Sequence, residues 1–221
     1  MSKYNTVMNP FKMLGFQIST LPCMKKTQDT PALASIDPRQ ALLDAARAIF
    51  VTEGVKGLSV RKVAESAGCT TMAVYSRMRG KDGILSALFD EGFELLANAQ
   101  AAVDIRLKNE DRLLAICNAY RATANAYPHH YALMLGQHSG DLSPSAESQS
   151  KALATLEVLR DAVASMSSIK SQNHQASFAI ANSLFALCHG WVSLQKIGFF
   201  DDSKKNQLAF KSAVLALLRI N

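Results

Sequence analysis

The sequence predicts an all-α protein with a small helical domain near the N-terminus and a larger helical domain after it. Apolar residues recur at helical spacing through residues 39–50, residues 58–67 and most of the chain beyond residue 85. Beyond residue 85, no segment alternates between apolar and polar residues as a half-buried strand does. A chain of 221 residues is long enough to bury the cores of two such domains.

Residues 1–37 differ in composition from the rest of the chain. They contain three prolines and scattered apolar residues without a helical stripe, so we expect a mobile basic arm. The apolar run at residues 13–16 is too short for a signal peptide. The four cysteines have no CxxC spacing, which predicts reduced thiols in a cytoplasmic protein.

The next segment has the spacing of two short helices joined by a tight turn. Residues 60–67 place apolar side chains on one face of a helix, and Ser59 precedes them as a candidate N-cap. Gly68 follows where a chain leaving a helix needs a positive φ, and Thr70 is a candidate cap for a second helix over residues 72–77. This pattern is typical of a helix-turn-helix. Because a generic αα-hairpin has the same spacing, the flanking sequence decides.

The flanking sequence favours the helix-turn-helix. A predicted helix over residues 39–50 ends near Gly54, and another begins at Lys81. Residues 39–85 as a whole resemble the DNA-binding domain of the TetR family of bacterial transcriptional regulators. The residues that carry this resemblance are Ala45, Ala46, Phe50, Gly54, Leu58, Ser59, Val60, Val63, Ala64, Ala67, Gly68, Val74, Tyr75, Lys81, Asp82, Ile84 and Leu85.

The resemblance implies a domain over residues 38–85 whose second motif helix enters the major groove of double-stranded DNA. The start of that helix would face base edges, while Tyr75 and Lys81 would bind phosphates as in the family. Met72 and Arg77 depart from the residues usual in the family, so no operator sequence is predicted. The residues expected to contact DNA are Ser59, Arg61, Thr70, Thr71, Met72, Ala73, Tyr75, Ser76, Arg77 and Lys81.

The distribution of charge agrees with a DNA-binding N-terminal domain. Residues 1–85 contain 12 Lys and Arg against 6 Asp and Glu, whereas residues 86–221 contain 12 of each. Residues 38–85 alone contain 8 basic against 4 acidic residues, so the excess does not depend on the arm. Such an excess is the electrostatic pattern of a phosphate-binding surface. The arm is expected either to stay a poorly ordered tail or to reach DNA beside the main contact.

Residues 86–221 are expected to form a helical ligand-binding and dimerisation domain. A long helix from Lys81 to about Asp104 would link it to the DNA-binding domain, and Pro128 would end the next helix. Residues 138–145 have the composition of a loop. The helices expected after the long one cover residues 111–127, 129–137, 146–166, 173–198 and 202–219.

The helix expected over residues 173–198 is apolar on two faces. Residues 171–195 contain no charged side chain, yet scattered Gln, Asn and Ser residues argue against a membrane span. A helix that is apolar on two faces must be covered on both, so we expect one face to pack within the subunit and the other against a second copy. The alternative is a monomer with one thick core. The expected interface residues are Ile180, Leu184, Leu187, Leu194, Leu208 and Leu215.

The resemblance also implies a pocket in the C-terminal domain for a small molecule that weakens DNA binding. Residues 187–194 resemble a motif of one C-terminal subfamily, with its His-Gly pair at His189 and Gly190. Few charges occur among the candidate pocket residues, so we expect an uncharged, apolar or aromatic ligand. Those candidates, each of which has an alternative role in the core, are Tyr120, Tyr127, Tyr131, Met134, Phe178, His189 and Trp191.

Other classes of function have weaker support. Two short serine motifs, at residues 136–140 and 167–170, lack the companion residues and the strand that a nucleophilic enzyme needs, so no catalytic residue is expected. His129, His130 and His138 lack a carboxylate or cysteine that would complete a metal site, and neither a metal nor a cofactor is expected. The resemblance to the TetR family therefore implies a homodimeric repressor released from a palindromic operator by a small ligand. The alternative is a dimeric sensor or protein-interaction module that no longer binds DNA specifically.

Overall fold

The computed structural model describes residues 37–135, 143–166 and 174–218. All regular secondary structure within these ranges is helical, as the sequence predicts. Residues 1–36 of the expected arm, His138 and both serine motifs lie outside the described residues. The helices are α1 (Pro38–Gly57), α2 (Val60–Ser66), α3 (Thr71–Met78), α4 (Gly80–Ala101), α5 (Asn109–Ala126), α6 (Pro128–Leu135), α7 (Ala146–Ala164), α8 (His174–Lys196) and α9 (Lys204–Leu217).

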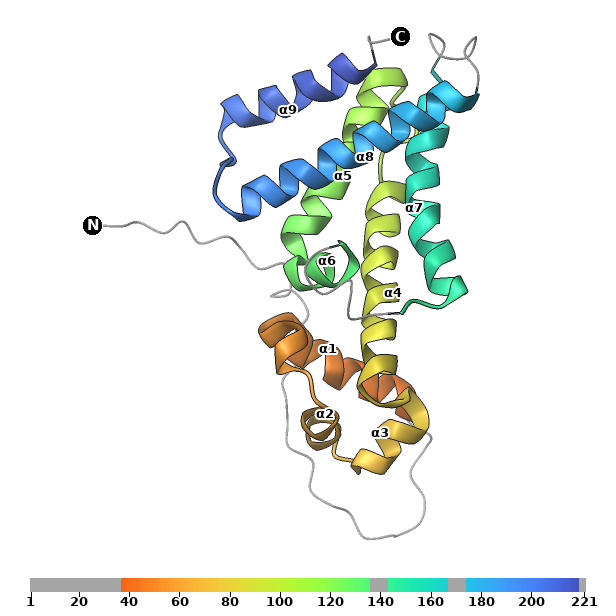
Figure 1. Cartoon of the computed structure of the whole chain (residues 1–221), viewed down its shortest axis with the longest axis vertical. Coiled ribbons are helices and arrows are strands. Elements are labelled where there is room, and N and C mark those ends of the chain that lie inside the picture. Colours follow the sequence, from red (N-terminus) through yellow and green to blue (C-terminus); the bar gives the residue numbers. More distant parts are fainter. Residues whose placement is uncertain (1–36, 136–142, 167–173, 219–221) are drawn as a thin grey trace, which may run out of the picture. The chain divides into compact units, whose positions relative to one another are not determined.

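Helices α1, α2 and α3 pack on one another around a small apolar core (Figure 1). Phe50 of α1, Val63 of α2 and Val74 of α3 are completely buried in it. Side-chain caps begin α2 and α3: the Ser59 hydroxyl accepts a hydrogen bond from the Lys62 N–H, and the Thr70 hydroxyl accepts one from the Ala73 N–H. Both predicted N-caps are therefore confirmed.

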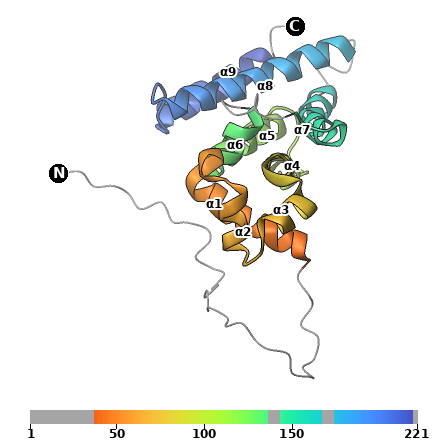
Figure 2. The same ribbon diagram turned by 60° about the horizontal axis from the view of Figure 1, so that its bottom comes forward.

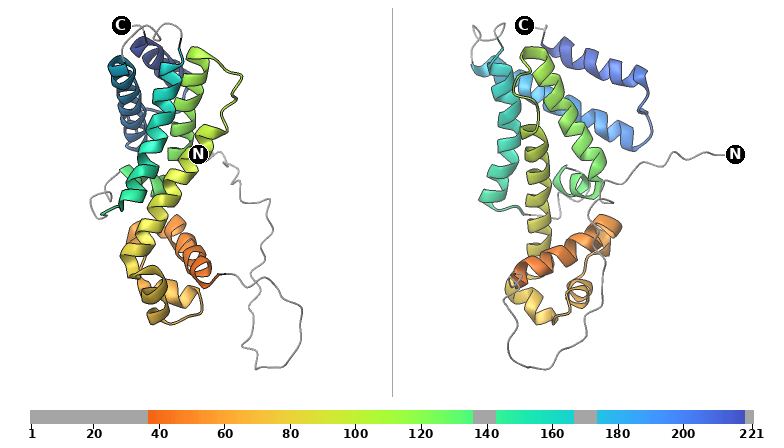
Figure 3. Two further views of the ribbon diagram at one scale, coloured as in Figure 1. Left: turned by 90° about the vertical axis from the view of Figure 1, so that its right-hand side faces the viewer. Right: turned by 180° about the vertical axis from the view of Figure 1, so that it is seen from behind.

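Helix α4 connects these three helices to the remaining ones. It begins directly after α3 and contacts α1 and α3, and farther along it contacts α5, α6 and α7 (Figures 1 and 3). Ile84, Leu88 and Phe93 are buried along its length. One helix therefore carries side chains that pack in both groups of helices, which makes α4 a direct mechanical link between them.

Helices α5, α7 and α8 form the second core together with α4. Helix α8 crosses α5 and α7, and α9 lies beside α8 and contacts α5 (Figure 2). Leu113 of α5, Leu159 of α7 and Leu184 of α8 are buried here. Each predicted helix of this region is present, with ends within a few residues of those expected.

The burial of α8 corrects the expected division of its two apolar faces. Ile180 and Leu184 were assigned to a dimer interface, but they are 5% and 0% exposed because α5 and α7 cover them within the chain. The uncovered face instead carries mainly small residues. Along it lie Ala179, Ser183, Ala186, Gly190 and Leu194.

Helix α8 is also long and apolar enough to cross a membrane by length and composition alone. Its span Gln175–Lys196 has a mean hydropathy of 1.3. Within the chain, however, α8 packs against α5, α7 and α9. This packing covers one face of α8, and 33% of its apolar span is buried within the chain.

Candidate nucleic-acid interface and ligand cavity

Helix α3 packs against neighbouring helices with one face and exposes the other face to solvent. Val74 and Met78 are buried against α1, α2 and α4, whereas the side chains of Met72 and Tyr75 are 73% and 58% exposed. Thr71, Ser76 and Arg77 are exposed beside them, and Ala73 is half-buried. A short helix with a fixed inner face and a polar outer face can enter a major groove without rearrangement.

The cations around α3 have no carboxylate partner among the described residues. Arg61, Arg77 and Lys81 are exposed and form no ion pair within that part of the chain. Lys62 differs, because its Nζ lies 2.7 Å from Glu53 Oε2. Three unpaired cations are therefore available to phosphates at the surface where sequence reasoning placed them.

The turn between α3 and α4 adds a residue that sequence reasoning missed. Arg79 is exposed and has a left-handed backbone (φ 57°), and Gly80 follows with φ 75°. A Cβ on Gly80 would lie 2.8 Å from Tyr75 Cε1, so the glycine leaves room for the Tyr75 ring against the turn. The run Arg77–Lys81, with three cations in five residues, was the available signal for Arg79.

The two remaining DNA-contact candidates have their hydroxyls engaged. Ser59 and Thr70 accept the N-cap hydrogen bonds of α2 and α3 at 3.2 and 3.3 Å. Each hydroxyl can still donate its own hydrogen to a phosphate oxygen, because a cap uses only the oxygen lone pair.

A second candidate site lies among α4, α5 and α6. Four of the expected ligand residues, Tyr120, Tyr127, Tyr131 and Met134, line one cavity together with Gly92 and other residues. The cavity has a volume of only about 10 Å³, room for about one water molecule. Met134 packs closely on Gly92 at the edge of this cavity, because a Cβ on Gly92 would lie 2.5 Å from its Sδ.

The two tyrosine hydroxyls of this cavity have hydrogen-bond partners, whereas the buried Nε2 of His130, which also lines it, has none among the described residues. The Tyr131 hydroxyl lies 2.7 Å from His189 Nδ1 and 3.4 Å from the Tyr120 hydroxyl. Burial raises the pKa of both tyrosines above the ordinary value, so both hydroxyls stay neutral near pH 7. A neutral, hydrogen-bonding wall favours an uncharged ligand over an ion.

Three of the expected ligand residues do not line this cavity, which corrects their assignment: His189, which reaches it only through the Tyr131 hydroxyl, Phe178 and Trp191. Phe178 is 44% exposed and lies under the guanidinium of Arg160, 4.8 Å from ring centre to Cζ. Trp191 packs on Phe200 and Phe210, with ring centres 4.5 and 5.2 Å apart. Neither side chain lines the cavity among α4, α5 and α6.

A polar junction joins the cavity helices to α1. Arg47 Nε of α1 lies 2.6 Å from Glu91 Oε1 of α4, and His130 Nε2 of α6 lies 3.7 Å from the same oxygen. The ring of His130 also packs edge-on against Phe50 of α1, with centres 4.9 Å apart. Burial opposes ionisation of Glu91, but the neighbouring His130 and the hydrogen bond from Arg47 together lower its pKa.

No group of three His, Cys, Asp or Glu side chains suited to a metal ion occurs among residues 37–135, 143–166 and 174–218. His129 and His130, the described members of the histidine set, instead pack against Phe50.

The chain matches sequence models of two regulator domains. Residues 42–88 match "Bacterial regulatory proteins, tetR family", and residues 113–217 match "Tetracyclin repressor-like, C-terminal domain". No curated protein sequence matches the chain. Both matched domains are those of a regulator, which agrees with the expectation that the protein is not an enzyme.

Solved structures share the fold. A protein of unknown function from Rhodococcus sp. RHA1 is 22% identical with a TM-score of 0.68, covering 86% of this chain and 98% of its own. A tetR-family regulatory protein from Rhodococcus RHA1 is 19% identical with a TM-score of 0.59, covering 84% and 97%. A TetR variant from Acinetobacter baumannii AYE, in complex with minocycline, is 16% identical with a TM-score of 0.57, covering 80% and 92%.

The helix-turn-helix over α2 and α3, the helical domain behind it and the two matched domain models lead to one identification: the chain belongs to the TetR family of DNA-binding transcriptional regulators.

Proposed function

We propose that the protein is a homodimeric repressor that leaves a palindromic operator when an uncharged apolar or aromatic molecule occupies the cavity among α4, α5 and α6. The observation that carries the DNA-binding part is the exposed outer face of α3, surrounded by cations without carboxylate partners in the described chain. Repression rather than activation is part of the proposal.

On DNA, the N-terminal half of α3 would read bases and its surroundings would hold the backbone. Thr71 and Met72 carry methyl groups suited to contact with the C5-methyl of thymine. Tyr75, Lys81 and Arg79 would bind phosphates and fix the register. Ser59, Arg61, Thr70, Ala73, Ser76 and Arg77 complete the proposed contact set.

We place the dimer contact on the uncovered face of α8. This face is free of charge, and a Cβ on Gly190 would meet nothing within 4 Å, so a second helix has room to approach closely. Leu194, 38% exposed, and the half-buried Leu187 border the face. Leu208, which lines a cleft towards α5, and the half-buried Leu215 lie outside its centre. The two α3 helices of such a dimer, related by a two-fold axis, would bind half-sites about 34–36 Å apart.

A ligand would act by changing which conformation of α6 is stable. The cavity of about 10 Å³ admits a larger molecule only if Met134 leaves Gly92. Met134 and His130 lie on the same helix, and His130 contacts Glu91 of α4 and Phe50 of α1. A ligand that prefers the opened cavity therefore favours a different placement of α1 and α4. That placement would change the distance between the α3 helices of the two subunits. The solved structure of similar fold that holds minocycline supports a small-molecule role for this domain.

Electrophoretic mobility shifts on DNA flanking the protein's own gene, at several salt concentrations, test DNA binding. We expect affinity to fall steeply with salt because bound phosphates release counterions. Lys81→Ala should weaken binding to all sequences and reduce the slope of log Kd against log salt by about 1. Tyr75→Phe should weaken it without changing that slope. Lys108→Ala removes an exposed cation before α5 and is the matched control.

The alternative, a dimeric sensor without specific DNA binding, rests on Met72 and Arg77, which differ from the residues usual in the family. It predicts that no DNA mobility shift is seen, or that a weak shift is reduced equally by Lys81→Ala and by Lys108→Ala.

A further inference from the structure

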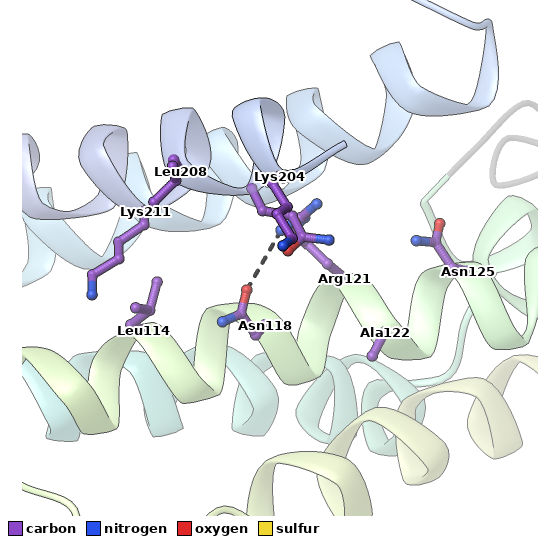
Figure 4. A pocket seen from close by; sticks show the side chains of 9 residues that line it. Leu114, Asn118, Arg121, Ala122, Asn125, Lys204, Leu208 and Lys211 are labelled. Carbon is purple, nitrogen blue, oxygen red and sulfur yellow. Dashed lines mark hydrogen bonds between the residues drawn. The ribbon is translucent and has the colours of Figure 1, made fainter. Parts of the chain in front are cut away.

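A cleft between α5 and α9 lies apart from both sites described above. It has a volume of about 680 Å³, within the range of about 300–1,000 Å³ typical of sites for small organic molecules. Figure 4 shows the side chains of Asn118 and Arg121 extending from α5 towards Lys204 on α9. None of its lining residues belongs to the cavity among α4, α5 and α6.

The charged groups of this cleft have one sign. Arg121 on α5 and Lys204 and Lys211 on α9 line it, and no carboxylate does. None of the three forms an ion pair with another residue in the described part of the chain. Such a set attracts an anion, because three cations face one space without an internal counter-charge.

Arg121 is the best-placed of the three cations. Its guanidinium is half-buried and packs on the Phe210 ring, 4.2 Å from Cζ to the ring centre. Its only hydrogen-bond acceptors in the described chain are neutral: Asn118 Oδ1 at 3.5 Å and Gln195 Oε1 at 3.4 Å. These distances are at the long limit for hydrogen bonds.

Two further observations show that the Arg121 charge is only partly compensated within the described chain. Its Nε is buried, and no described residue accepts a hydrogen bond from it. Burial lowers the pKa of Arg121, although the Asp202 carboxylate nearby partly opposes this effect. Asp202 itself accepts a hydrogen bond from Gln195 Nε2 at 2.9 Å. A desolvated guanidinium with neutral partners would gain most from a bidentate anion.

We propose that this cleft binds a small organic anion, with its carboxylate or phosphate group on Arg121, Lys204 and Lys211 and its apolar part on Leu114 and Leu208. Leu208 is 65% exposed beside the lysines, so its burial under a ligand removes apolar surface from water. The site takes a charged ligand, whereas the cavity among α4, α5 and α6 is lined by neutral hydroxyls.

The proposed dimer contact leaves the cleft open. Lys204, Leu208 and Lys211 recur at helical spacing on the side of α9 that faces α5. The proposed dimer face lies instead on α8, along Gly190 and Leu194. Anion binding and dimerisation are therefore expected to be independent.

Isothermal titration calorimetry with 2-naphthoate, 2-naphthyl phosphate and neutral 2-naphthamide tests the proposal on the full-length protein. We expect at least one anion to bind about tenfold more tightly than the amide, because only the anions use the cations. The two anions distinguish a carboxylate from a phosphate site. The test variants are Arg121→Gln and the double variant Lys204→Gln/Lys211→Gln, and Lys205→Gln is the control on the same helix outside the cleft.

We expect both test variants to weaken anion binding about tenfold and Lys205→Gln to leave it unchanged. If Arg121→Gln fails to fold, the double variant decides, because both lysines are exposed. The proposal is wrong if the amide binds as well as the anions, if no probe binds, or if Lys205→Gln weakens binding as much as the double variant. Anion binding unaffected by the double variant would place the ligand elsewhere, for instance beside Tyr120 and Tyr131.

Discussion

The outer face of α3 and the cavity among α4, α5 and α6 are prepared for their ligands in opposite ways. The α3 face is open, and its cations have no carboxylate partner in the described chain. The cavity is nearly filled, and the hydroxyls of Tyr120 and Tyr131 are satisfied by each other and by His189. The first surface can bind without changing, whereas the second must change before it can bind.

In the mechanism proposed above, this difference gives the two regions different roles. A rigid DNA-binding surface is an advantage because it loses little conformational entropy on binding DNA. A cavity that opens only around a ligand is useful because the opening itself can be transmitted to neighbouring helices. The contact between the two regions, at Phe50, Glu91 and His130, is where that transmission has to pass.

The largest expected effect is at Phe50, which packs between the core beneath α3 and helix α6 beside the cavity. Its ring is completely buried in the α1–α3 core and packs against His129 and His130 of α6. We expect Phe50→Ala to lower the free energy of unfolding by about 3–5 kcal/mol, measured by urea denaturation. Val51→Ala, at a neighbouring position that is 51% exposed, is the control. Equal effects of the two variants would contradict a shared core at this position.

The next effect concerns the packing that closes the cavity. A methyl group on Gly92 would overlap Met134, so Gly92→Ala should destabilise the protein by about 1–3 kcal/mol. Met134→Ala removes the overlapping side chain, so the double variant should lose less stability than the two single losses together. We expect a coupling of about 0.5–3 kcal/mol in a double-mutant cycle of urea unfolding. Additive losses would show that Met134 does not fill this space.

A smaller effect on stability is expected at the start of α3, where a local hydrogen bond from the Ala73 N–H to Thr70 caps the helix. Thr70→Ala removes the cap on the Ala73 N–H and should cost about 1 kcal/mol of unfolding free energy. Thr71→Ala, at the next position, has no cap to lose and should change stability by less than about 0.5 kcal/mol. If thermal denaturation gives the two variants the same stability, the cap does not hold α3.

The same contrast explains which features the sequence could predict. The N-caps at Ser59 and Thr70 and the glycine turn after α2 depend on neighbours in sequence, and all were predicted. The DNA-facing position of Tyr75 was implied by the family resemblance, and its side chain is 58% exposed. Such features are local, so a short window of sequence contains the physics that produces them.

The errors concern contacts between helices. A helix as apolar as α8 has no single apolar stripe, so its period did not reveal that Ile180 and Leu184 face α5 and α7. Trp191 packs on Phe200 and Phe210 because α9 folds back beside α8, which no local pattern encodes. Arg79 is a local exception, because the run of three cations at Arg77–Lys81 was a signal in the sequence that was not used.

The smallest expected effect is a pH dependence of the junction between the two regions. The neighbouring His130 and the hydrogen bond from Arg47 lower the pKa of Glu91 below its ordinary value of 4.5 despite burial. A carboxyl group whose folded-state pKa is lowered stabilises the fold above its unfolded-state pKa, and this contribution disappears as the pH falls through the folded-state value. The wild type should therefore exceed Glu91→Gln in unfolding free energy near pH 7, and the difference should shrink below about pH 4.5.

Urea unfolding of both proteins between pH 7 and pH 3.5 measures this difference, with Glu94→Gln as the exposed control on the same helix. A difference that stays constant over this range would mean that the Glu91 carboxylate gains nothing from Arg47 and His130 in the folded protein. The open α3 face would then be tied to the closed cavity by apolar contacts such as Phe50–His130 alone, because no titrating group would contribute to the link.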